Sequence, residues 1–144
     1  MISNQIPENF NRKFDVVSCF LEHDGKVLML HRQDQKPQGN TWDMPAGKVH
    51  DNESVNEALS REVEEELGIK INPENFEYSR KFYVKYPEYH YIYHVLTLKI
   101  DKMPEIKLNL EENKGFTWLK PEEALKLNLI EDEDTVLKVC YGVK

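Results

Sequence analysis

The stretch from Gly47 to Ile69 constrains this chain more than any other, because it combines a predicted helix with a face of carboxylates. The helix is expected over about Ser54 to Leu67. Its apolar positions recur at the spacing that packs one helix face on a core, namely Val55, Ala58, Leu59, Val63 and Leu67. Glu62, Glu65 and Glu66 also share one face, which lies within or beside that stripe.

Three like charges on a half-buried face repel one another, and a buried carboxylate is costly unless it is paired. Arg61 is a single cation and cannot neutralise three carboxylates. A hard divalent cation with oxygen ligands can do so. The alternative is a solvated acidic face, which is what most runs of charge are. Glu64 points roughly the opposite way and stands apart from the three.

The flanks of the helix favour the metal site. Gly68 stands where a glycine ends a helix, and Gly47 follows a turn formed with Pro45. The whole segment resembles the Nudix box, G-x5-E-x7-R-E-U-x-E-E-x-G-U, in which U is aliphatic. Every specified position matches: Gly47, Glu53, Arg61, Glu62, Val63, Glu65, Glu66, Gly68 and Ile69. A looser resemblance extends from about Phe14 to Leu125.

The resemblance implies a metal-dependent hydrolase that cleaves a diphosphate linkage. The substrate would be a nucleoside di- or triphosphate, or a nucleoside diphosphate linked to another moiety. Divalent cations make such cleavage feasible by cancelling phosphate charge and acidifying a bound water. Mg²⁺ is the expected cofactor and Mn²⁺ the expected substitute, since both suit hard oxygen ligands. Glu62, Glu65 and Glu66 would hold the metal, and either Glu62 or Glu65 would be the general base.

Further site residues are expected outside the helix. Family members hold a metal partly through a backbone carbonyl, which Ala46 would supply here, although it replaces the usual glycine. They often add an acid from the loop before a tryptophan-containing strand. Glu112 occupies that place ahead of Trp118. Arg32 and Lys48 are candidates for holding substrate phosphates. The remaining box residues are expected to be structural: Gly47, Glu53, Arg61 and Gly68.

The length predicts one α/β domain over residues 1–144, with a loose lead-in over 1–13. Strands are expected at 14–22, 27–32, 76–86, 89–100 and 115–119, and helices at 54–67, 121–125 and 131–143. This alternation, with the resemblance, implies the Nudix fold. That fold is an α/β/α sandwich whose mixed sheet carries the box helix on one side and the C-terminal helix on the other.

The composition restricts the partners. A net charge of -7 argues against a general nucleic-acid binder. No run of eighteen apolar residues predicts a membrane span. Cys19 and Cys140 are expected to be free thiols in a cytoplasmic protein. The expected partner is a small phosphorylated substrate. The oligomeric state stays open, with a homodimer as one option.

The sequence does not select one substrate. The MutT-like branch, which hydrolyses nucleoside triphosphates, fits the short length. Asp132, Glu133 and Asp134, however, occupy the region of its purine-reading Asn. Tyr86 lies where dinucleoside polyphosphate hydrolases carry a tyrosine. The Lys36–Gly39 loop resembles one found in nucleotide-sugar hydrolases of this superfamily.

Two other classes stay open. An isomerase like isopentenyl diphosphate isomerase shares the fold, but its additional catalytic cysteine and histidine pattern is not evident. A non-catalytic Nudix-like nucleotide-binding module would normally have lost box carboxylates, and none is missing here. His90 and His94 share a strand face and suggest zinc, but a structural role is favoured because no third ligand is in view.

Overall fold

The fold is organised around one long central strand, β2 (Arg12–His23). A computed structural model describes every residue from 1 to 144. The other strands are β1 (Ile2–Ser3), β3 (Lys26–Arg32), β4 (Trp42–Asp43), β5 (Ala46–Lys48), β6 (Glu77–Lys85), β7 (His90–Lys99) and β8 (Asn113–Leu119). The helices are α1 (Val55–Leu67), the short 3₁₀ helix η1 (Pro73–Asn75), α2 (Pro121–Ala124) and α3 (Glu133–Tyr141).

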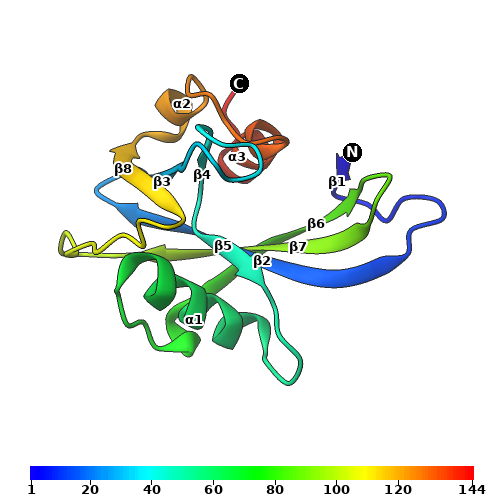
Figure 1. Ribbon diagram of the computed structural model, residues 1–144, viewed down its shortest axis with the longest axis horizontal. Helices are drawn as coiled ribbons and strands as arrows, with labels where there is room; N and C mark the ends of the chain where they lie inside the picture. The colour runs from blue at the N-terminus through cyan, green and yellow to red at the C-terminus, as the bar shows by residue number, and fades with distance from the viewer.

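The eight strands form one sheet in the order β1-β6-β7-β2-β3-β4, with β5 paired to β2 and β8 paired to β3. β2 runs parallel to β7, while every other pairing is antiparallel. The sheet is therefore mixed, as predicted. Figure 1 shows that it is strongly bent, with β5 crossing its middle.

Helices cover both faces of the sheet. α1 lies on one face, and α2 and α3 lie on the other (Figure 1). Alternate residues of β2 divide between the two cores: Val17, Cys19 and Leu21 pack with α1, whereas Phe20 packs with α3. The predicted sandwich, with the box helix and the C-terminal helix on opposite faces, is confirmed.

The ends of α1 follow from local chemistry. Ser54 accepts a hydrogen bond from the Glu57 amide, and the Glu57 carboxylate accepts one from the Ser54 amide, which forms a capping box. At the other end Gly68 adopts a left-handed conformation with φ 70°, and its N–H bonds the carbonyl of Glu64. The predicted helix bounds are therefore confirmed.

The N-terminal segment differs from the prediction. A loose lead-in was expected over residues 1–13, but Ile2 and Ser3 pair with Val84 and Tyr83 on β6. The exposed edge of β6 offers unpaired backbone groups, and a two-residue strand satisfies some of them. β2 also begins at Arg12, earlier than expected.

The start of α3 is also later than predicted. The helix begins at Glu133, two residues after the expected start at 131. Asp132 has φ 71°, which lies outside the right-handed helical region, so the helix cannot include it.

Candidate functional site

The box helix is held against β5 through a glycine. A Cβ placed on Gly47 would lie 2.1 Å from the Cδ atom of Glu62, so any side chain at this position would displace that carboxylate. The Glu62 side chain is 13% exposed and is enclosed between β5 and α1. Gly47 thus permits the close approach that keeps Glu62 beside the strand.

Arg61 joins the loop before α1 to the helix itself. Its Nε and Nη2 atoms donate to the two oxygens of Glu53 at 2.7 and 3.0 Å, and Nη2 also donates to the Lys48 carbonyl at 2.9 Å. This hydrogen bonding lowers the pKa of Glu53 to about 2. Nη1 donates to Oε1 of Glu62 at 2.7 Å. These contacts support the structural task predicted for Glu53 and Arg61.

Glu66 is the carboxylate of the box that forms no ion pair, whereas Arg61 contacts the other three. The residue is part exposed, but its carboxyl group is enclosed, and this burial raises its pKa well above the ordinary value. The carboxylates of Glu62, Asp43 and Glu112 raise the pKa further, whereas a hydrogen bond with the Ala46 backbone lowers it. Such an excess of negative charge is what a divalent cation would neutralise.

The predicted metal ligands are only partly gathered. Glu66, Glu112 and Ala46 line one small cavity of about 40 Å³, which Arg32 and Asp43 also line. Glu65 is exposed, and its Oε2 atom lies 3.5 Å from Nη1 of Arg61. As the side chains stand, no three acidic, histidine or cysteine residues converge closely enough to hold a metal ion.

The two predicted phosphate-binding cations have different surroundings. Arg32 lines the small cavity beside Glu66, and its Nε donates to the Pro37 carbonyl at 3.1 Å. The Nζ atom of Lys48 lies 4.3 Å from the centre of the Phe14 ring. Only Arg32 therefore shares a cavity with the box carboxylates.

A second cavity, of about 230 Å³, lies next to the first. Tyr86, Tyr89, Tyr91 and Tyr93 line it from the strands. The residues around the start of α3 line it from the other side. Asp43 and Ala46 line both cavities, so a molecule in the tyrosine-lined cavity would adjoin the carboxylates of α1.

The protein-family model of the NUDIX domain matches residues 12–140, which is most of the chain. The chain belongs to the Nudix family. The CTP pyrophosphohydrolase of Escherichia coli K12 is 33% identical over 135 residues, covering 92% of this chain and 95% of the relative. The nucleoside triphosphatase NudI of Escherichia coli O139:H28 is 29% identical, covering 82% and 89%. The solution structure of the E. coli ORF135 protein superposes with a TM-score of 0.74 at 30% identity, covering 88% and 87%.

The Nudix domain is therefore a pyrophosphohydrolase, as the box implied. Nudix enzymes are in general dependent on divalent metals, which agrees with the enclosed carboxyl of Glu66. No helix in the structure has the length and apolar character needed to cross a membrane.

The sequence did not predict that two carboxyl groups of the Nudix domain are buried together. Asp43 and Glu133 interact inside the tyrosine-lined cavity, and burial raises the pKa of both, that of Glu133 well above its ordinary value. The Oε1 atom of Glu133 is buried without a hydrogen-bond partner. A usable signal existed, because Glu133 stands three and four residues before the buried Val136 and Leu137 on one helix face.

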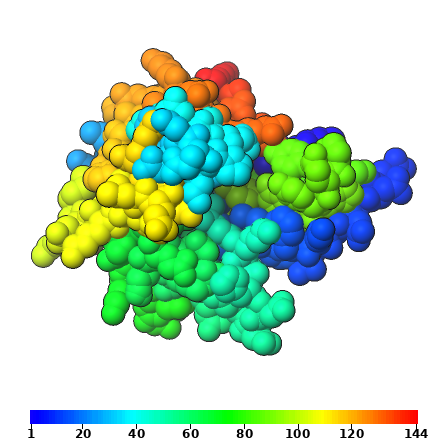
Figure 2. All heavy atoms as spheres, in the orientation of Figure 1, coloured from blue at the N-terminus to red at the C-terminus, as the bar shows by residue number.

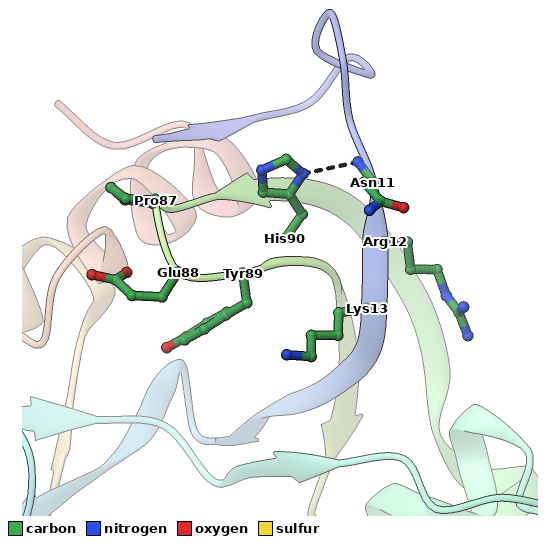
Figure 3. Close-up of a pocket in the computed structure, with 7 residues that line it drawn as sticks. All are labelled: Asn11, Arg12, Lys13, Pro87, Glu88, Tyr89 and His90. Carbon is green, nitrogen blue, oxygen red and sulfur yellow. Dashed lines mark hydrogen bonds between the residues drawn. The ribbon is translucent and has the colours of Figure 1, made fainter.

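The histidines that suggested zinc have other partners. His94 contacts Asp15 through Nε2 at 2.7 Å and the Tyr78 hydroxyl through Nδ1 at 2.6 Å. The His90 Nδ1 atom accepts from the Asn11 amide at 2.8 Å, which Figure 3 marks with a dashed line. Both ring nitrogens of His94 and the Nδ1 atom of His90 are therefore bonded to protein groups.

A third hollow, of about 450 Å³, opens beside the tip of the β6–β7 hairpin. Lys13 and Tyr89 point into it, and Arg12 points away (Figure 3). Arg12 forms an ion pair with Asp15 instead. Glu88 is the one carboxylate in this hollow, so it lacks the acid cluster that diphosphate chemistry needs. It adjoins the tyrosine-lined cavity through Tyr89.

Proposed function

We propose that this Nudix domain hydrolyses nucleoside triphosphates to the monophosphate and pyrophosphate, with a divalent metal and with CTP as a substrate. The observation that carries the proposal is the juxtaposition of two cavities. One contains the enclosed Glu66 carboxyl, which forms no ion pair, and the other is lined by four tyrosines. The relatives named for CTP and nucleoside triphosphates support the same choice.

The residues present fit a hard divalent cation. Glu62, Glu65 and Glu66 would hold it, with Glu112 and the Ala46 carbonyl as additional oxygen ligands. Arg61 bonds only Oε1 of Glu62, which leaves Oε2 for a metal. Mg²⁺, or Mn²⁺ in its place, would supply charge neutralisation for the phosphates and a more acidic water.

The residues of the chain would do the remaining work. Glu62 or Glu65 would accept the proton of the attacking water, because both belong to the same helix face as Glu66. Arg32 would contact a phosphate, since this residue lines the cavity of Glu66. Lys48 remains a candidate for a phosphate contact, although it lies against Phe14.

The tyrosine-lined cavity would hold the nucleoside. Its aromatic rings offer faces for a base, and base–aromatic stacking contributes about 1–3 kcal/mol. Glu133 lines this cavity, so it would place a carboxyl group beside the nucleoside. The triphosphate would then extend past Asp43 and Ala46 toward Glu66.

A hydrolysis screen tests the proposal. CTP, UTP, ATP, GTP, ADP-ribose, a nucleotide sugar and a dinucleoside polyphosphate are each incubated with Mg²⁺ or with excess chelator. Products are separated by ion-exchange chromatography. We expect CTP to give CMP and pyrophosphate with Mg²⁺ only. Hydrolysis confined to the last three substrates, or unchanged in chelator, would show that the proposal is wrong. A parallel incubation with isopentenyl diphosphate tests the isomerase class, which its conversion to the isomer would favour.

A further inference from the structure

The loop of residues 33–41, between β3 and β4, is bound to the segment that carries Glu112. The Gln33 amide donates to the Glu112 carbonyl at 3.0 Å, and the Gln33 side chain donates to the Leu110 carbonyl at 2.7 Å. The loop is closed at its base by backbone bonds between Arg32 and both Asn40 and Thr41. Figure 2 shows this cyan loop lying against the yellow segment around residue 110.

The loop has little room to change shape. A Cβ at Gly39 would lie 2.2 Å from the Asp34 carbonyl oxygen, so no side chain fits there. Gln38 and Asn40 both have positive φ, at 52° and 64°. The Thr41 hydroxyl donates to the Gln38 carbonyl at 2.7 Å. The side chains of the loop are therefore presented from a defined backbone.

One side chain of this loop lines the tyrosine-lined cavity, and another contacts an acid that lines the small cavity. The Nζ atom of Lys36 donates to Oε1 of Glu112 at 2.9 Å, and Glu112 lines the small cavity with Glu66. Gln38 lines the tyrosine-lined cavity, where its Oε1 accepts from the Glu131 amide at 2.9 Å. One loop thus contacts both ends of the site, the nucleoside end directly and the phosphate end through Glu112.

The nearby cations differ in how firmly they are engaged. Arg61 is held by Glu53, Glu62 and a backbone carbonyl. Lys36 has a single carboxylate partner, and that partner is an acid that a metal ion would share. Both side chains of this pair are partly exposed, at 30% and 42%, so the pair is weak and readily exchanged.

We propose that Lys36 is a substrate-binding residue that changes partner during the reaction. It pairs with Glu112 in the free enzyme. With Glu112 engaged as a metal ligand, the ammonium group of Lys36 would bind the terminal phosphates of the triphosphate. The proposal rests on the proposed function. The proposal predicts opposite effects on two affinities when Lys36 is removed. Metal binding becomes stronger, because a competing cation is gone, and triphosphate binding becomes weaker.

The test compares Lys36→Met with Lys114→Met. Lys114 contacts Asp34 and Asn40 of the same loop at 2.7 and 2.9 Å, so its removal carries the same charge change and weakens loop contacts without touching Glu112. Mn²⁺ binding to the metal-free protein is measured by electron paramagnetic resonance. Binding of α,β-methylene-CTP in the presence of Mn²⁺ is measured by calorimetry. Thermal melts verify folding.

For Lys36→Met we expect the Mn²⁺ Kd to fall about two- to fivefold, which is the limit for an exposed ion pair worth about 1 kcal/mol. The Kd for the analogue should rise about tenfold or more, or about 1.4 kcal/mol. Lys36→Arg should restore analogue binding to within about threefold, since the charge returns. Lys114→Met should leave both constants within about twofold.

The proposal is overturned if Lys36→Met leaves analogue binding unchanged, if it weakens Mn²⁺ binding, or if Lys114→Met reproduces its effects. A parent protein that binds neither Mn²⁺ nor the analogue overturns the proposed function and this proposal together. A parent that binds and hydrolyses CTP, while Lys36→Met behaves like the parent, overturns the Lys36 proposal alone.

Discussion

Glu64 and Glu66 stand two positions apart on α1, yet their side chains meet different surroundings. Glu64 is exposed, whereas the carboxyl of Glu66 is enclosed beside Glu62, Asp43 and Glu112. Helix periodicity alone separates these two residues, because positions two apart point to different sides. The difference offers a controlled comparison within a single helix.

Glu66→Gln should lower kcat/KM at saturating Mg²⁺ by about a hundredfold or more, equivalent to about 3 kcal/mol of lost transition-state stabilisation. The substitution removes a negative ligand oxygen and keeps the size of the side chain. The fold should survive or gain stability in chelator, since repulsion from the neighbouring carboxylates is relieved. Steady-state kinetics and thermal melts measure both effects.

Glu64→Gln is the matched control. An exposed substitution of this kind usually changes stability by about 0.5 kcal/mol or less, so its kcat/KM should stay within a few-fold of the parent. Equal losses in the two variants would mean that the helix acts through its total charge, and the assignment of Glu66 as a metal ligand would be wrong.

Which site residues could be predicted depends on how far apart their partners lie in the sequence. The acid face of α1 was visible because Glu62, Glu65 and Glu66 conflict with a local apolar pattern. The pairing of Asp43 with Glu133 joins segments that are distant in the chain, and no local pattern specifies it. Acids in the first turn of a helix are usually exposed and favoured by the helix dipole, so the position of Glu133 alone does not indicate its burial.

At the scale of elements, the loop before α1 is attached to the helix through Glu53 and Arg61. The pKa of Glu53 is about 2, compared with an ordinary value of 4.5. A carboxyl whose pKa is lowered on folding contributes stability that is fully present above the ordinary value. That contribution is lost as the pH falls toward 2.

Glu53→Gln should therefore lower the free energy of unfolding at pH 6, and the deficit relative to the parent should shrink as the pH falls from 4.5 toward 2. Urea unfolding at pH 6 and pH 3 measures the deficit. Glu88→Gln, on the exposed hairpin tip, is the control and should show little deficit at either pH. A deficit for Glu53→Gln that is the same at both pH values would contradict a role through the ionised carboxylate.

Elements were predictable where their ends carry local chemistry. Ser54 and Gly68 terminate α1 by a capping box and a left-handed residue, both readable from sequence. The strand partners were not readable in this way, because an alternating apolar pattern says which face is buried but not which strand lies alongside. The pairing of β1 with β6 was missed for the same reason, since two residues carry no periodic pattern.

At the scale of the whole molecule, the site concentrates acids in a protein with a net charge of -7. A ligand that binds only the folded state raises its stability, by about 2.7 kcal/mol at a concentration of 100 Kd. Mg²⁺ should therefore raise the melting temperature relative to the same protein in chelator, because it would neutralise the enclosed carboxylates around Glu66.

Differential scanning calorimetry with and without Mg²⁺ measures this shift. Na⁺ at equal ionic strength controls for general screening. The shift should be much smaller in Glu66→Gln, which lacks the central carboxylate. A shift of the same size in that variant would place the stabilising metal elsewhere on the molecule.

The parallel pairing of β2 with β7 has a consequence for the order in which the protein assembles. Phe14 pairs with Tyr91, and the box helix and most of the β6–β7 hairpin lie between them in the chain. A chain emerging from the ribosome therefore completes α1 before the centre of the sheet beneath it can close. Such long-range pairing slows folding, typically to roughly milliseconds to seconds. Before β7 pairs with β2, the sheet surface that α1 packs on is incomplete, so the apolar face of α1 stays exposed. The chain is most prone to aggregation during this interval.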